Sequence, residues 1–228
     1  MKDIIKIQRG VYRKNYLQFG YGPSGVFWNN YTTMNLRFEH LIKPFIGLLP
    51  TEFSICDIGS GLCDLHSYLN EKKLGHKYTG IEIVPEMIEK SEKKYKNIRI
   101  LNIDFLNNSF KEKFDILILS GTFNMPGGIS KIEWDDFIFS VLKKMYSSSR
   151  IGISFNALST YTTFLSEDLY YLNPGKIIEF IQKRLSRFLI VDAAMPIYEN
   201  TYTVFKPEFI KDIHPHADFK KYFRNDIE

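Results

Sequence analysis

The sequence from residue 53 onward alternates short apolar runs with longer amphipathic ones, and this alternation constrains the fold more than any other feature. The apolar runs and the amphipathic segments between them follow in the order 53–58, 65–73, 78–83, 85–95 and 98–103. A strand, a covering helix and the next parallel strand produce such a pattern. The sequence therefore predicts an α/β fold made of β-α-β units.

Further elements extend this pattern toward the C-terminus. The run 114–119 is almost wholly apolar, as expected of a central strand that is buried on both faces. A helix at 132–146 and a strand at 151–155 follow. A later helix begins at Pro174, because proline fits the first turn of a helix. These elements bring the parallel strands to five.

Two β-rich runs end the pattern. They cover 187–193 and 201–205 and are joined by a short connection. Such a pair predicts an antiparallel hairpin. The complete sheet would then hold seven strands, most of them parallel.

The chain of 228 residues shows no internal repeat and no linker rich in proline, glycine or serine, so we expect one catalytic domain at 51–207. Residues 1–50 crowd aromatic side chains together with glycines, which predicts a folded, partly helical N-terminal cap. An insertion at about 157–173 would interrupt the catalytic domain, and residues 208–228 would form a charged tail.

Charge and composition disfavour several classes of protein. The 30 basic and 26 acidic side chains are scattered along the chain, which argues against a nucleic-acid-binding surface. Cys56 and Cys63 match neither a metal-ligand pattern nor a disulfide framework, and the histidines suggest no metal site. The N-terminus lacks the apolar core of a signal peptide, and no later run approaches the length of a membrane span. We therefore expect a metal-free, cytoplasmic protein without a membrane span.

The segment that carries most chemical information lies where the first predicted strand turns into the first helix. It reads Cys-Asp-Ile-Gly-Ser-Gly-Leu-Cys-Asp, and Gly59 and Gly61 let the backbone approach a ligand closely. A dinucleotide-binding turn needs a third small residue at the position that Asp64 occupies here. The turn therefore disfavours NAD.

The same segment resembles the D-x-G-x-G motif of class I S-adenosylmethionine-dependent methyltransferases, carried here by Asp57, Gly59 and Gly61. The family often has cysteine between the two glycines, and Ser60 is small enough to preserve the turn. The resemblance implies a Rossmann-like sheet whose last strand is inserted beside the fifth. It also implies S-adenosylmethionine as the cofactor and S-adenosylhomocysteine as the product.

Three later strand ends carry residues that the resemblance assigns to the cofactor. Glu82 ends the second strand, where a carboxylate can accept hydrogen bonds from both ribose hydroxyls. Asp104 would take the adenine amino group and Phe105 would cover the ring. Ser120 and Gly121 would border the methionine half. The full set of implied cofactor-binding residues is Arg37, Asp57, Gly59, Ser60, Gly61, Glu82, Ile83, Asp104, Phe105, Ser120 and Gly121.

Four segments narrow the resemblance to one bacterial subgroup, whose members often accompany surface-polysaccharide genes. The segments are 35–39, 120–124, 155–159 and 168–174, so the similarity extends over nearly the whole chain. This comparison implies that Arg37 grips the cofactor's carboxylate through two parallel hydrogen bonds. A surface position for this arginine is the alternative.

The acceptor is less well specified than the cofactor. Aromatic and amide side chains near the predicted cleft would shape its pocket, and they are Tyr12, Tyr21, Trp28, Asn124, Asn156, Tyr170 and Tyr171. Ordinary core packing is the alternative for each aromatic member. We assign no catalytic base, because the need for one depends on the acceptor: a hydroxyl would benefit from a base that removes its proton, whereas a phosphate or carboxylate oxygen is already charged and would need none.

We therefore expect a methyltransferase that O-methylates a small molecule, a sugar nucleotide or a phosphorus-linked precursor of a bacterial surface polysaccharide, as a monomer or homodimer. Another small metabolite is one alternative acceptor. A non-catalytic binding module with this fold is a further alternative, and the intact glycine motif and Glu82 argue against it. A nucleic-acid methyltransferase is disfavoured, because no Asn-Pro-Pro-aromatic run follows the fourth strand.

Overall fold

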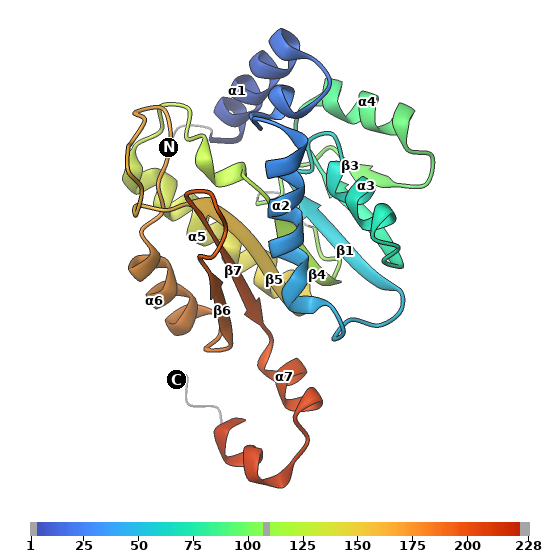
Figure 1. Cartoon of the computed structure of the whole chain (residues 1–228), viewed down its shortest axis with the longest axis vertical. Helices are drawn as coiled ribbons and strands as arrows, with labels where there is room; N and C mark the ends of the chain where they lie inside the picture. Colours follow the sequence, from blue (N-terminus) through green and yellow to red (C-terminus); the bar gives the residue numbers. More distant parts are fainter. Residues whose placement is uncertain (1–3, 107–109, 224–228) are drawn as a thin grey trace.

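A mixed seven-stranded sheet lies at the centre of the molecule (Figure 1). The structure is a computed structural model that describes residues 4–106 and 110–223. The strand order is β3-β2-β1-β4-β5-β7-β6, in which β7 runs antiparallel to both β5 and β6 and all other pairs are parallel. The strands are β1 (Phe53–Ile58), β2 (His76–Ile81), β3 (Arg99–Leu101), β4 (Phe114–Leu119), β5 (Ser149–Leu158), β6 (Leu189–Asp192) and β7 (Glu199–Phe205).

The predicted sheet is confirmed, including the C-terminal hairpin and the insertion of the last strand beside the fifth. Several strands differ in length from the prediction, among them β3 and β5. β3 is shorter than the apolar run at 98–103, because it is an edge strand that pairs with β2 alone. β5 is longer than the run at 151–155, because β4 and β7 pair with it on its two sides.

Helices cover both faces of the sheet (Figure 1). Leu117 and Leu119 of β4 join an apolar layer with α5 (Lys131–Ser148) and α6 (Pro174–Arg184). Ile116 and Ile118 join a second layer with α2 (Tyr31–Ile42) and α3 (Asp64–Glu71). Successive strand residues point to opposite faces, so a central strand must be apolar throughout. No helix among the described residues has the length and apolar character that crossing a membrane requires. The helices are α1 (Ile4–Phe19), α2 (Tyr31–Ile42), α3 (Asp64–Glu71), α4 (Pro85–Lys94), α5 (Lys131–Ser148), α6 (Pro174–Arg184) and α7 (Pro207–Ile213).

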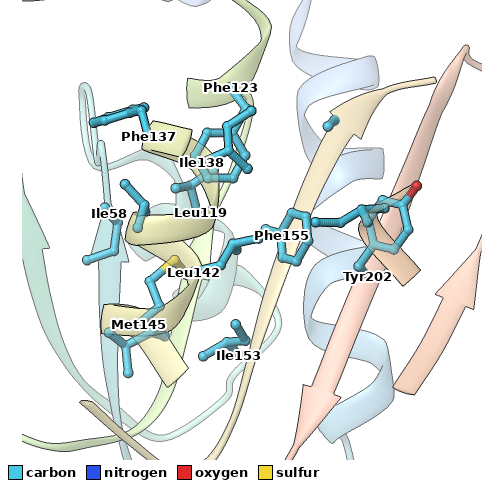
Figure 2. Packing of buried hydrophobic residues seen from close by; sticks show 14 of the residues in the cluster. Ile58, Leu119, Phe123, Phe137, Ile138, Leu142, Met145, Ile153, Phe155 and Tyr202 are labelled. Carbon is cyan, nitrogen blue, oxygen red and sulfur yellow. The ribbon is translucent and has the colours of Figure 1, made fainter. Parts of the chain in front are cut away.

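Figure 2 shows how the first apolar layer is filled. Ile138, Leu142 and Met145 lie on successive turns of α5 and are completely buried. Across the layer, Phe155 of β5 stacks on Tyr202 of β7 with ring centroids 5.1 Å apart. This packing joins the antiparallel hairpin to the parallel part of the sheet.

The N-terminal segment is fixed to the rest of the molecule through polar contacts of α1. The Gln8 amide nitrogen, Nε2, donates to the Met125 carbonyl in the loop after β4 over 2.7 Å. Asn15 Nδ2 donates to the two carbonyls of the turn at 24–25, at 2.7 and 2.9 Å. A short 3-10 helix, η1 (Pro23–Val26), leads from α1 to α2, which packs into the second apolar layer.

The segment between β5 and α6 is held against α5 and the loop after β4. The backbone N–H of Tyr170 donates to the Asn124 carbonyl over 2.9 Å. Its hydroxyl donates to the buried Asp135 carboxylate of α5, which Lys176 also contacts. Tyr170 therefore serves as the anchor of this segment.

A buried hydrogen bond joins the middle of β2 to the carboxyl end of β1. The Tyr78 hydroxyl donates to Asp57 Oδ2 over 2.6 Å. Burial raises the pKa of the Asp57 carboxyl to about 7, although the Tyr78 hydrogen bond favours the ionised form and partly offsets this effect. The unfolded chain releases this proton near pH 4, at about the ordinary pKa of aspartate. Between the two pKa values only the folded state binds the proton, so stability falls as the pH rises.

We expect Asp57→Asn to remove this contribution to the pH dependence of stability. From pH 5 to 7 the free energy of unfolding of the wild type should fall, relative to that of Asp57→Asn, by about 1.4 kcal/mol per pH unit. Urea unfolding at a series of pH values measures the difference. Tyr78→Phe is a control that should change the pH profile in the opposite direction to Asp57→Asn. Loss of the hydroxyl raises the pKa of Asp57 further, so the free energy of unfolding should continue to fall at higher pH. Parallel profiles for wild type and Asp57→Asn would contradict the expectation.

Candidate cofactor and acceptor site

A cavity of about 290 Å³ lies at the carboxyl ends of β1, β2 and β4, beneath the N-terminal segment. Open α/β sheets bind their ligands at this edge. All the predicted cofactor-binding residues line this cavity except Asp104 and Phe105. Its walls include Gln8, Tyr12, Val26, Trp28, Arg37, Asp57, Gly59, Ser60, Gly61, Glu82, Ile83, Ser120, Gly121, Thr122, Asn124, Leu158, Leu169 and Glu199.

The turn after β1 brings the backbone to the cavity wall. Gly59 and Gly61 have φ angles of 70° and 53°, in the left-handed region that favours glycine. A Cβ atom on Gly59 would lie 2.4 Å from the Thr122 hydroxyl oxygen, so any larger residue would require Thr122 to move as well as an unfavourable φ angle. The N–H groups of Gly59 and Ser60 both donate to the Ile81 carbonyl, which fixes the turn to the end of β2.

Glu82 connects this turn with the turn that follows β2. One carboxylate oxygen accepts the N–H of Gly61 at 2.8 Å, and the other accepts those of Ile83 and Val84 at 2.7 and 2.9 Å. Burial raises the pKa of the Glu82 carboxyl, and the three backbone hydrogen bonds oppose that effect. A carboxylate offers about four acceptor positions, so a further acceptor position remains for a ligand.

Trp28 packs on the segment after β4. Gly121 has a φ angle of 73°, and a Cβ atom there would lie 2.2 Å from the Trp28 ring. Asn156 Oδ1, from β5, accepts the N–H of Gly121 at 2.8 Å. The hydroxyl of the neighbouring Ser120 is buried and has no hydrogen-bond partner among the described residues. The glycine therefore lets an aromatic side chain of the cap close one wall of the cavity.

A buried ion pair joins the cap to the last strand of the sheet. Arg37 Nη2 and Nε donate to the Glu199 carboxylate at 2.6 and 3.0 Å. Arg37 Nη1 donates to the Thr33 carbonyl, and the guanidinium lies 4.2 Å from the centre of the Trp28 ring. Arg37 is thus an interior residue, and both members of the pair line the cavity.

A second, smaller cavity of about 70 Å³ adjoins the first, since Gln8, Gly59, Ile83 and Thr122 line both. Most of its wall is apolar, with Ile103 and Phe105 among the lining residues. Asp104 lines neither cavity, and its carboxylate accepts the N–H of Leu106 at 2.9 Å. Phe105 thus lines the smaller cavity, whereas Asp104 lines neither.

Three residues predicted for the acceptor pocket line the main cavity, namely Tyr12, Trp28 and Asn124. Burial, and secondarily the negative charge of Glu82, raise the pKa of Tyr12 well above its usual value, which keeps the phenol protonated. Asn124 Oδ1 accepts the N–H of Leu158 at 3.1 Å, which joins the loop after β4 to the end of β5.

The other predicted acceptor residues do not line it. Tyr21 is exposed and accepts a hydrogen bond from Lys94. Asn156 lies below Gly121, and Tyr170 anchors the segment before α6. The Tyr171 hydroxyl accepts a hydrogen bond from a backbone N–H within that same segment.

The residues of the cavity wall that sequence reasoning missed include Gln8, Leu158, Leu169 and Glu199. Glu199 lies two residues before the predicted start of the last strand, and an acidic residue beside a β-branched run was its only signal. Gln8 lies on an amphipathic helix, where a polar side chain is usually solvated. Among the described residues, no group of three or more histidine, cysteine or acidic side chains is arranged to hold a metal ion.

Sequence comparison identifies relatives among methyltransferases. A family model described as a methyltransferase domain matches residues 55–144, which contain the glycine turn, Glu82 and the segment after β4. A protein of Mycobacterium tuberculosis named "Putative methyltransferase Rv1506c" is 31% identical over 157 residues. The aligned region covers 68% of this chain and 93% of that protein.

Solved structures with the same fold include two methyltransferases of low sequence identity. Magnesium protoporphyrin IX methyltransferase from Synechocystis, with bound S-adenosylmethionine, matches with a TM-score of 0.60 at 12% identity, covering 90% of this chain and 98% of that one. The 1,6-didemethyltoxoflavin-N1-methyltransferase of Burkholderia thailandensis matches with a TM-score of 0.60 at 12% identity, covering 88% of each chain. By fold and by its mycobacterial relative, this chain belongs to the methyltransferase family and has the class I, S-adenosylmethionine-dependent type of fold.

Proposed function

We propose that this protein transfers a methyl group from S-adenosylmethionine to an oxygen of a small molecule, a sugar or a phosphorus-linked precursor of a bacterial surface polysaccharide. The observation that best supports this cofactor is the cavity at one edge of the sheet, which is lined by the glycine turn, Glu82 and Arg37. The cavity combines backbone that a ligand can approach with the buried carboxylate of Glu82 and the buried guanidinium of Arg37.

The adenosine half of the cofactor fits the part of the cavity beside β2. The remaining acceptor position of Glu82 suits a ribose hydroxyl. The adjoining apolar cavity, lined by Ile83 and Phe105, suits the flat face of adenine. The two spaces are contiguous, as a nucleoside requires.

The methionine half fits between the glycine turn and Arg37. A guanidinium has five N–H groups, of which three donate to Glu199 and the Thr33 carbonyl. The remaining two are available for the cofactor's carboxylate. The Ser120 hydroxyl on the opposite wall has no partner among the described residues and would supply another polar contact.

Methyl transfer needs an acceptor oxygen aligned behind the methyl carbon. The oxygen lone pair forms the new O–C bond while the C–S bond breaks and its electron pair stays on sulfur, which becomes the thioether of S-adenosylhomocysteine. A hydroxyl acceptor also loses its proton, whereas a phosphate oxygen has none to lose. Alignment in a closed cavity is the main catalytic device, and the cap residue Trp28 helps to exclude water.

The surface-polysaccharide acceptor is supported by where the four resembling segments meet. Arg37 lies in 35–39, Asn124 in 120–124, Leu158 in 155–159 and Leu169 in 168–174, and all four residues line the cavity. The resemblance therefore extends to residues of the cavity wall outside the glycine motif. The magnesium protoporphyrin IX methyltransferase and the 1,6-didemethyltoxoflavin-N1-methyltransferase act on other small molecules, which supports a small acceptor in general.

The cofactor is tested by calorimetric titration with S-adenosylmethionine and S-adenosylhomocysteine. We expect micromolar binding to the wild type and at least about a tenfold loss in Glu82→Gln, because a charge-assisted hydrogen bond contributes roughly 1.5–3 kcal/mol. Glu89→Gln, an exposed carboxylate of α4 that pairs with Lys93, is the matched control and should bind normally. NAD should not bind. A folded wild type that binds neither sulfur compound would refute the methyltransferase activity.

The role of Arg37 is tested with Arg37→Lys, which keeps the charge and loses the planar fork of donors. We expect the dissociation constant of S-adenosylmethionine to rise about tenfold, as for one lost charge-assisted hydrogen bond. Arg13→Lys, on the exposed side of α1, should leave it unchanged. If Arg37→Lys and the wild type bound S-adenosylmethionine with equal affinity, the role of Arg37 would be limited to the ion pair with Glu199.

The acceptor class is tested by transfer of a labelled methyl group to nucleotide-activated sugars and to phosphorus-linked polysaccharide precursors. We expect a labelled O-methyl product from one of these classes and its loss at saturating cofactor in Asn124→Leu, which changes the wall away from the adenosine part. Methylation confined to unrelated metabolites would support the small-metabolite alternative. Tight cofactor binding without transfer to any acceptor would support a non-catalytic binding module.

A further inference from the structure

Gln8 of the cap helix α1 lies where the two cavities meet. Only 3% of its surface is exposed, and it lines both the main cavity and the smaller apolar one. It comes from the first turns of the chain, far in sequence from the glycine turn. Any ligand that extends from one cavity into the other passes this side chain.

The orientation of the Gln8 amide is fixed by its nitrogen. Nε2 donates to the Met125 carbonyl over 2.7 Å, a contact that the amide oxygen could not make. Oε1 is therefore the free end of the amide, and it has no hydrogen-bond partner among the described residues. A buried acceptor without a partner costs free energy, so native proteins rarely keep one that has no use.

The chemistry of the neighbouring space identifies the donor that Oε1 lacks. The smaller cavity has the apolar walls of a site for a flat ring, including Ile83, Ile103 and Phe105. In adenine that is attached to ribose, the 6-amino group carries the only N–H donors of the base. Asp104, which the family resemblance assigns to this amino group, lines neither cavity, and its carboxylate accepts the N–H of Leu106.

We propose that Gln8 Oε1 accepts a hydrogen bond from the adenine 6-amino group, which makes the cap helix part of the adenosine-recognition site. This inference rests on S-adenosylmethionine being the cofactor. Gln8 would then have two roles. Its amide nitrogen binds α1 to the loop after β4, and its amide oxygen accepts the hydrogen bond from adenine. Recognition of adenine then stabilises the contact between α1 and the loop after β4.

The test compares S-adenosylhomocysteine with an analogue whose base is purine without the 6-amino group, by calorimetric titration of the full chain. The wild type should bind the adenine compound about three- to tenfold more tightly, the net worth of one hydrogen bond. Gln8→Met, of similar length but without an acceptor oxygen, should bind the two compounds equally.

Two further variants separate the alternatives. Gln8→Glu keeps an acceptor oxygen and loses the donor to Met125, so it should retain the preference for adenine even if overall affinity falls. Asp104→Leu, which loses both acceptor oxygens, should also retain it. Collapse of the preference in Asp104→Leu, or its persistence in Gln8→Met, would overturn the inference.

Binding of the two compounds to the wild type distinguishes a wrong role of Gln8 from a wrong cofactor. Equal binding of both compounds to the wild type would overturn the role of Gln8 and leave the cofactor in place. Binding of neither compound to the folded wild type would refute the cofactor and the role of Gln8 together. Thermal unfolding of each variant checks that a lost preference does not arise from a lost fold.

Discussion

The carboxylate of Glu82 holds together the two turns from which the cavity is built. It accepts the Gly61 N–H from the turn after β1 and the Ile83 and Val84 N–H groups from the turn after β2. A proton on either oxygen would place a fourth donor among three donors, so the arrangement favours the ionised form. Burial acts in the opposite direction and raises the pKa of Glu82. The shape of the ligand-binding edge therefore depends on a charge that has been removed from water.

The cap is joined to the sheet by a second charge arrangement of a similar kind. Arg37 and Glu199 are both buried, and each would be costly to keep there alone. Apolar residues of the same volume could pack at least as well, so such a pair is weak support for stability by itself. Its position in the cavity wall, with the Trp28 ring over the guanidinium, gives a functional reason for its presence.

The parts of this protein that were predictable from sequence are those that short-range patterns determine. The apolar run at 114–119 has the composition of a central strand, and the structure places β4 there with its alternate side chains in two apolar layers. The glycines of the motif were recognisable because their backbone conformation excludes most other residues. Both features belong to single local segments.

The residues that were missed depend on contacts between distant segments. Gln8 becomes an interior side chain only because α1 docks on the loop after β4. Glu199 reaches the cavity only because β7 is inserted between β5 and β6. Conversely, Tyr21 belongs to an aromatic cluster in sequence but lies exposed beside Lys94. Neither periodicity nor composition carries information about such docking.

The insertion of β7 also sets the order in which the site can be completed during synthesis. Arg37 and Glu199 are 162 positions apart in the chain, and the glycine turn lies between them. Proteins are made from the N-terminus and their domains fold as units during synthesis. The parallel strands can therefore pair while Arg37 still lacks its carboxylate, and the cap gains this partner only once the last strand has left the ribosome. A nascent chain that ends before β7 would contain the whole glycine motif and still lack a finished cavity.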